Sequence, residues 1–303
     1  MAKEDEVESV VDIPLAPSDA SSDHQVTWTR IIEPDRAFLA IPFREIWQYR
    51  DLLLLLVRRD FVALYKQTIL GPIWFVLQPV MMTIVFTIVF GNIAQISTDG
   101  LPQVLFYLAG VTMWTYFQDS LIKTSETFTL NANIFGKVYF PRIIVPLSVV
   151  VSGLLKFAVQ FTIFLAFAVY YTVSVPEVAP NAAILLLPLL LLLMGVLGLS
   201  IGMIISALTT KYRDLRFLMT FGVQLLMYAT PVIYPVSAIP EAYRSYILAN
   251  PITPIIETFR YAFTGAGTVD VMHLTYSCSF AVVALCVALV IFNQVEKNFM
   301  DTV

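Results

Sequence analysis

Residues 57–79 read VRRDFVALYKQTILGPIWFVLQP, and this stretch decides the fold. Its first ten positions hold four charged residues: Arg58, Arg59, Asp60 and Lys66. The next charged residue is Asp99, so a charge-free run of 32 residues follows directly. Only the Gly71–Pro72 pair separates the charged part from the apolar part, and proline suits the first turn of a new helix. The stretch predicts a helix on the membrane surface that turns at once into a membrane-spanning helix.

The composition of the whole chain also indicates a membrane protein. Of its 303 residues, 58% are hydrophobic and 13% are charged, whereas soluble domains carry about 25% charged residues. Acidic residues gather in the N-terminal tail, where residues 1–27 hold seven Asp or Glu and one Lys. Such a segment cannot bury enough apolar surface to fold. We predict that residues 1–41 form a disordered cytoplasmic tail.

Runs without Asp, Glu, Lys or Arg predict six membrane-spanning helices. A helix needs about 20 apolar residues to cross the hydrocarbon core, and six runs of 19 to 33 residues are available. They place the spans at 70–92, 103–123, 147–172, 182–209, 215–235 and 271–293. The expected fold is an all-α integral membrane protein, with a membrane domain over residues 69–295 and a cytoplasmic C-terminal tail over residues 296–303.

The distribution of Lys and Arg predicts that both termini are cytoplasmic. Cytoplasmic loops of membrane proteins carry an excess of these residues. With the N-terminus inside, fifteen of the eighteen fall in cytoplasmic segments, and the outer loops hold only Arg244 and Arg260. The remaining cation, Lys156, falls inside the third predicted span.

Residues 42–68 are predicted to form an amphipathic helix in the cytoplasmic interface. Their apolar residues recur at helical spacing, but the longest apolar run is too short to cross the membrane. Each Arg, Lys or Asp would also cost about 2.5–3.5 kcal/mol at the bilayer centre. The helix is either a simple anchor or a lever. The short joint favours a lever, because any tilt of this helix would also tilt the first span.

Two further segments lie outside the predicted spans. Residues 131–142, NANIFGKVYFPR, predict a short cytoplasmic helix between spans 2 and 3 with exposed apolar side chains. This helix would either dock into a groove on a soluble partner or pack under the chain's own spans. The outer segment 237–270 predicts two short helices around Asn250–Pro251, forming either a lid or a plain surface loop. Glu257 and Arg260 lie three apart on the second helix and can pair.

Several motifs together resemble the permease subunits of polysaccharide-export ABC transporters, within the type-2 ABC exporter family. The stretch WQYRDLLLLLVRRDFVALYKQTILGPIW at 47–74 carries most of the resemblance. KVYFPR at 137–142, YRDL at 212–215 and TPVIYP at 230–235 add to it, and the similar region covers residues 42–295. Members of this family export O-antigen, capsular polysaccharide or teichoic acid.

The resemblance implies a half-transporter in the bacterial inner membrane. Two copies would form the channel as a homodimer, and two copies of a cytosolic ABC ATPase would drive export of a polysaccharide carried on undecaprenyl diphosphate. Residues 42–66 would be the interfacial gate helix, the 2–3 loop the coupling helix, and residues 240–264 the outer gate helices. Membrane lipids would surround the chain, and no nucleic acid is expected.

The chain itself is expected to be no enzyme. It contains no GxxxxGK[ST] phosphate loop and no His, Cys, Asp and Glu cluster with metal-ligand spacing. No cofactor is therefore expected in this chain, and the resemblance assigns ATP and Mg²⁺ to the partner ATPase.

The candidate site residues fall into four groups. The gate-helix residues placed to meet a lipid diphosphate, or to serve only as membrane anchors, are Arg58, Arg59, Lys66 and Tyr65. The residues expected to couple to the ATPase are Asn133, Phe135, Lys137 and Tyr139. The aromatic residues that could line a channel, or else pack in the core or against lipid, are Trp74, Phe75, Phe86 and Phe90. The outer-gate residues are Glu257, Phe259, Arg260 and Phe263.

Lys156 needs an explanation, because an unpaired lysine inside a span is costly. Asp119 is the only acid in the adjacent second span. The lysine could instead start shallow and extend toward the interface. We predict that Asp119 and Lys156 pair or share a water-filled cytoplasmic vestibule at the channel entrance.

Two other functions fit parts of the pattern. A permease of the same superfamily could export a drug or a small lipid, although the aromatic content and the 42–66 motif favour a glycan. A membrane glycosyltransferase would need free acids near a metal or a base in an outer loop. The outer loops hold few acids, and Glu257 already has Arg260 as a partner. Transport of a polysaccharide is therefore the preferred interpretation.

Overall fold

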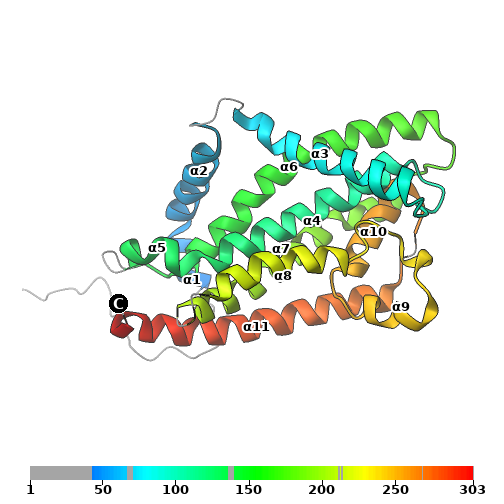
Figure 1. The fold of residues 1–303 in the computed structure, drawn as a ribbon. Helices are drawn as coiled ribbons and strands as arrows, with labels where there is room; N and C mark the ends of the chain where they lie inside the picture. The colour runs from blue at the N-terminus through cyan, green and yellow to red at the C-terminus, as the bar shows by residue number, and fades with distance from the viewer. Residues whose placement is uncertain are drawn as a thin grey trace, which may run out of the picture. The chain divides into compact units, whose positions relative to one another are not determined.

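The computed structural model describes residues 43–66, 71–135, 140–210, 212, 214–267 and 269–302, all within the unit formed by residues 37–303 (Figure 1). The described residues form helices joined by turns, and they include no strand. The predicted tail, residues 1–41, lies outside the described residues, and so do Lys137 and Tyr139. The side chains of Tyr65 and Asn133 are likewise not described.

Helices occupy each place where a span is predicted. They are α3 (Trp74–Phe86) with the π-helical turn η2 (Thr87–Ile93), α4 (Gln103–Ser125), α6 (Ile144–Ser174), η3 (Ala182–Leu186) with α7 (Leu187–Thr209), α8 (Leu215–Tyr228) and α11 (Val271–Thr302). Four stretches are long and apolar enough to cross a membrane: Trp74–Ile93, Ile144–Ser174, Ala182–Thr209 and Val271–Val295. By length and composition the chain is a multi-pass membrane protein, and a total of six spans stays a prediction.

The two remaining long helices differ from plain apolar spans. α4 is long enough to cross but carries Asp119 and Lys123 toward its end. α8 has 14 residues and ends at Tyr228, seven residues before the predicted end of the fifth span. Pro231 accounts for the early end, because it has no backbone N–H to donate to the carbonyl of residue 227.

The segments outside the predicted spans are also helical. They are α1 (Phe43–Gln48), α2 (Arg50–Lys66), η1 (Gly71–Ile73), α5 (Thr127–Phe135), η4 (Val236–Ala238), α9 (Glu241–Leu248) and α10 (Thr253–Thr264). α2 packs against α6 and contacts η1. Gly71, at the start of η1, has a φ of +53°, a left-handed conformation that glycine adopts without strain.

α4 is the central helix of the described fold. It contacts α3, α6, α7, α8 and α10, and most of its residues are buried. Figure 1 shows α9 and α10 near one end of the long helices and α5 near the other. α4 therefore connects the segment predicted to face outward with the segment predicted to face the cytoplasm.

α7 approaches α4 closely through two glycines. A Cβ atom at Gly198 would lie 2.8 Å from Cβ of Ser120. At Gly202 it would lie 2.6 Å from Cβ of Thr124 and 2.8 Å from the carbonyl oxygen of Leu121. Real side chains do not approach this closely, so the absence of a side chain is what lets the two backbones touch.

Gly202→Ala is expected to lower the free energy of unfolding by about 1–3 kcal/mol, because the added methyl group must push α4 and α7 apart. Gly222→Ala is the matched control, since nothing lies within 4 Å of the position its Cβ would take in α8. Thermal unfolding of both variants in one detergent makes the comparison. Equal melting temperatures for the two variants would contradict a tight α4–α7 contact.

Candidate functional site

The interfacial helix presents its cations to the surroundings. Arg58 and Lys66 are exposed on α2. Arg59 is also exposed, and its Nη2 lies 2.8 Å from Oδ1 of Asp60. α2 also buries Leu56 and packs it into an apolar cluster with α5, α6, α7 and α11. The exposed surface of α2 is mixed, because Leu54 and Leu55 are 60% and 62% exposed beside the cations.

The short helix between the second and third predicted spans packs inward through Phe135. This ring is only 4% exposed. Its centroid lies 5.9 Å from that of Phe128 and 5.8 Å from that of Phe140, and the guanidinium of Arg142 lies 5.5 Å from it. The ring fills the chain's own cluster, which agrees with the alternative that this helix packs under the chain's own spans, and a coupling role for Phe135 stays a prediction. Leu130, on the same helix, is 65% exposed instead.

The aromatic residues predicted to line a channel divide into two kinds. Trp74 is 48% exposed and Phe90 is partly buried. Phe75 and Phe86 are 5% and 4% exposed. The ring of Phe86 packs edge-on against Tyr107, with centroids 6.0 Å apart. Phe75 and Phe86 are therefore buried in this chain, in agreement with the alternative that they pack in the core, and a lining role for any of the four stays a prediction.

A polar stripe on α4 was missed by reasoning from aromatic residues. Beyond its first turn, the positions of α4 that stay partly open are Thr115, Gln118, Asp119, Ile122 and Lys123. The indole Nε1 of the adjacent Trp114 donates a hydrogen bond of 2.8 Å to Oε1 of Gln118. Several of these side chains border a pocket of about 60 Å³ whose other walls include Gln78 of α3 and Met227 of α8. The helical spacing of the polar residues was the signal that could have identified this stripe.

Asp119 and Lys156 form an ion pair between α4 and α6. Nζ of Lys156 lies 2.7 Å from Oδ2 of Asp119, and their side chains are 14% and 24% exposed, respectively. Lys156 follows the first residue of α6 by twelve positions, which is about 18 Å along a helix. The pair therefore joins the two helices well away from the start of α6. Whether it borders a vestibule stays a prediction.

The outer hairpin, formed by α9 and α10, contains a buried arginine. Glu257, Phe259, Arg260 and Phe263 all lie on α10 and are 6%, 0%, 2% and 4% exposed. The guanidinium of Arg260 donates to Oε1 of Glu257 at 2.7 Å and to the carbonyl oxygen of Pro231 at 2.8 Å. It also lies 3.7 Å from the ring centroid of Phe106 in α4. α10 is consequently part of the core, and the alternative of a plain surface loop does not apply to it.

Backbone geometry fixes where α10 ends. Gly265 has a φ of +78° and donates its N–H to the carbonyl oxygen of Tyr261 at 2.9 Å. A Cβ atom there would lie 2.8 Å from the carbonyl oxygen of Ala179. Both the left-handed conformation and the close approach require glycine.

Burial dominates the electrostatics of the Glu257–Arg260 pair. Desolvation raises the pKa of Glu257 above its ordinary range, and the nearby guanidinium of Arg260 opposes part of that rise. Burial and the neighbouring charge therefore act on this carboxylate in opposite directions.

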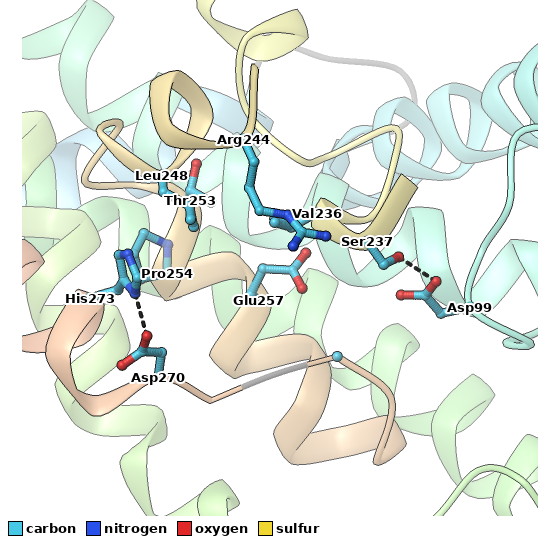
Figure 2. A pocket seen from close by; sticks show the side chains of 11 residues that line it. Asp99, Val236, Ser237, Arg244, Leu248, Thr253, Pro254, Glu257, Asp270 and His273 are labelled. Carbon is cyan, nitrogen blue, oxygen red and sulfur yellow. Dashed lines mark hydrogen bonds and ion pairs between the residues drawn. The ribbon is translucent and has the colours of Figure 1, made fainter. Parts of the chain in front are cut away.

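A pocket of about 250 Å³ lies beside this pair (Figure 2). Figure 2 shows Arg244 reaching from α9 toward Glu257, with Ser237 and Asp99 beside it. The hydroxyl of Ser237 donates to Oδ1 of Asp99 at 2.6 Å, which joins the α3–α4 loop to the hairpin. Nε of Arg244 is buried and has no hydrogen-bond partner within the described part of the chain. The pocket thus brings together charged groups of both signs.

Residues 51–264 match the ABC-2 type transporter family. The chain belongs to the ABC-2 type transporters. The match begins in α2 and ends with α10, so this ABC-2 domain includes the interfacial helix, the polar stripe and the buried Arg260 cluster.

Several relatives of this ABC-2 chain are named for polysaccharide export. The O-antigen export system permease protein RfbA of Myxococcus xanthus is 28% identical over 262 residues, which cover 86% of this chain and 98% of that protein. A Klebsiella pneumoniae protein of the same name is 26% identical, covering 83% and 94%. The polysialic acid transport protein KpsM of Escherichia coli is 21% identical, covering 77% and 89%. The resemblance inferred from the motifs is confirmed.

Proposed function

We propose that this ABC-2 chain is the membrane subunit of an ATP-driven exporter that moves a lipid-linked polysaccharide from the cytoplasmic to the outer side of the bacterial inner membrane. The observation that carries the proposal is the similarity to an O-antigen export permease over 98% of that protein's length. The lipid carrier would be undecaprenyl diphosphate. The chain would cross the membrane six times with both termini in the cytoplasm, and ATP would be hydrolysed by a separate partner subunit.

The polar stripe of α4 supports a path along the face shared by α3, α4 and α8. Gln118 and the Asp119–Lys156 pair would be costly in contact with lipid. This face therefore suits water, substrate or a second copy of the chain. A homodimer would enclose the stripe between two protomers, and the exposed Trp74 would lie at its edge.

The predicted cytoplasmic side and the predicted outer side of the protein would serve different steps of export. Arg58, Arg59 and Lys66 are exposed cations that suit the diphosphate of the lipid carrier. Leu130 is an exposed apolar residue of α5 that suits a groove on the ATPase. The predicted roles of Asn133, Lys137 and Tyr139 in coupling stay part of the proposal. α9 and α10 would form the outer gate.

Deleting the gene that encodes this chain, in the bacterium that produces it, tests the proposal. The surface polysaccharide should disappear and its lipid-linked form should accumulate inside the cell. Gel analysis of surface glycan and extraction of the lipid-linked pool measure both quantities. Surface glycan that persists while efflux of a drug or a small lipid falls would contradict the proposal.

Charge reversal on α2 tests the headgroup role in the complemented strain. Arg58→Glu with Arg59→Glu is expected to reduce surface glycan, because two anions would face the diphosphate. The matched control is Arg50→Glu with Arg44→Glu, which reverses two exposed cations farther from the joint with α3. Equal export by both double variants, with equal amounts of protein in the membrane, would leave Arg58 and Arg59 as membrane anchors only.

A further inference from the structure

Pro79 removes a hydrogen-bond donor from the inside of α3. In an α-helix, the carbonyl of residue 75 accepts from the N–H of residue 79. Pro79 has no N–H, so the carbonyl of Phe75 loses its helical partner. Both residues are buried. A buried carbonyl without a donor is destabilising, and in a membrane no solvent is at hand to supply one.

Gln160 supplies the missing donor from another helix. Its Nε2 donates to the carbonyl oxygen of Phe75 at 3.1 Å. Gln160 is only 3% exposed and lies near the middle of α6, within a stretch long and apolar enough to cross the membrane. A buried glutamine in such a helix needs a polar partner, so the glutamine and the carbonyl satisfy each other.

The accepting residue lies where three helices meet. The ring centroid of Phe75 is 6.2 Å from that of Phe61 in α2, the interfacial helix. Lys156, one turn before Gln160 on α6, holds Asp119 of α4. Successive turns of α6 therefore bind α4 through an ion pair and α3 through a backbone carbonyl. The hydrogen bond to α3 is made at the first turn of α3, which is also the turn that packs against α2 through Phe75.

We propose that Gln160 is a positioning residue that clamps the first turn of α3, where Pro79 removes the helical hydrogen bond. Through Phe75 and Phe61, the clamp sets how a tilt of α2 reaches α3. Without it, the first turn of α3 can move independently of α6, and motion of α2 no longer reaches the rest of the span in a defined way. The expected consequence for export rests on the proposed function, whereas the expected consequence for stability does not.

The test is a double-mutant cycle on Gln160 and Pro79. Pro79→Ala restores the N–H that can bind the carbonyl of Phe75, so Gln160 becomes dispensable in that background. Gln160→Leu alone is expected to lower the melting temperature by about 2–5 °C, because a buried acceptor is left without a donor. The same change in the Pro79→Ala background is expected to cause less than half of that loss. The full-length chain with its partner ATPase is used throughout.

Thr162→Val is the control for removing a polar side chain from the same helix, at a position that is exposed. Thr162 lies two residues further along α6, and its hydroxyl donates within the helix to the carbonyl oxygen of Ala158 at 2.9 Å. Its replacement removes a polar group without releasing α3. It is expected to leave the melting temperature and export close to those of the unmodified chain.

A second readout separates positioning from plain packing. At a temperature where all variants are folded, Gln160→Leu should export less polysaccharide per ATP hydrolysed, while ATP hydrolysis continues. Equal temperature losses in both Pro79 backgrounds, or an unchanged export ratio for Gln160→Leu, would overturn the proposal. If the unmodified chain exports no polysaccharide, the proposed function fails, and the melting-temperature cycle still decides whether the carbonyl clamp exists.

Discussion

Replacing Arg260 with methionine is expected to lower the free energy of unfolding by about 3–5 kcal/mol, the range for breaking a buried ion pair. The change leaves the carboxylate of Glu257 buried without a cation and the carbonyl oxygen of Pro231 without this donor. It also removes the cation from the face of Phe106. Thermal or chaotrope unfolding of the purified protein measures the loss.

The double variant Glu257→Gln with Arg260→Met is expected to lose less than Arg260→Met alone. Burial raises the pKa of Glu257 despite the nearby guanidinium, which indicates that the carboxylate is costly to bury. Arg244→Met is the matched control, since it removes an arginine of the same hairpin that forms no ion pair among the described residues. If Arg260→Met costs no more than Arg244→Met, the buried cluster does not hold the hairpin.

Replacing Lys156 with alanine is expected to cost about 3 kcal/mol, at the lower end of the range for breaking a buried pair. The remaining carboxylate of Asp119 would then lie in α4 without its cation. Lys156→Ala with Asp119→Asn should be more stable than Lys156→Ala alone, because no uncompensated charge remains. A double-mutant cycle in detergent melting measures the coupling.

Arg216 and Glu126 provide the control for this cycle. Their Nε and Oε1 atoms are 2.8 Å apart, against 2.7 Å for the Lys156–Asp119 pair, but the side chains are 43% and 29% exposed. Exposed pairs contribute little to stability, so Arg216→Ala is expected to change it by less than about 1 kcal/mol. Additive effects of the Lys156 and Asp119 substitutions would show that the two groups do not stabilise each other.

Scarce residues were easier to interpret from the sequence than abundant ones. Few charged residues fall inside the predicted spans, and each of them needs a partner. That requirement led to the prediction that Lys156 pairs with Asp119. The Glu257–Arg260 pair follows from helical spacing. Its depth did not follow, because the charge pattern does not show that α10 lies in the core.

Aromatic residues could not be placed from the sequence in the same way. Phe75, Phe86 and Phe135 are apolar on every side, and apolar rings fit a core, a lipid face or a partner's groove equally well. Only the packing of α2, α4 and α5 around them decides which surface each ring occupies. The same limit applies to Gln160, because its hydrogen-bond acceptor is a backbone carbonyl 85 residues earlier in the sequence. The sequence shows that Pro79 deprives the carbonyl of residue 75 of its helical donor. It does not show that Gln160 supplies the new donor.

The glycine contact between α4 and α7 has a mechanical consequence. The backbones approach closely at Gly198 and Gly202, so we expect these two helices to move together rather than separately. Arg260 holds α10 against the same pair of helices through Phe106, so movement at the outer gate would fall mainly to α9. Rearrangements during a transport cycle would then fall to helices outside this pair, such as α2, α3 and α8. In this chain, α4 and α7 would stay in place while the helices around them move.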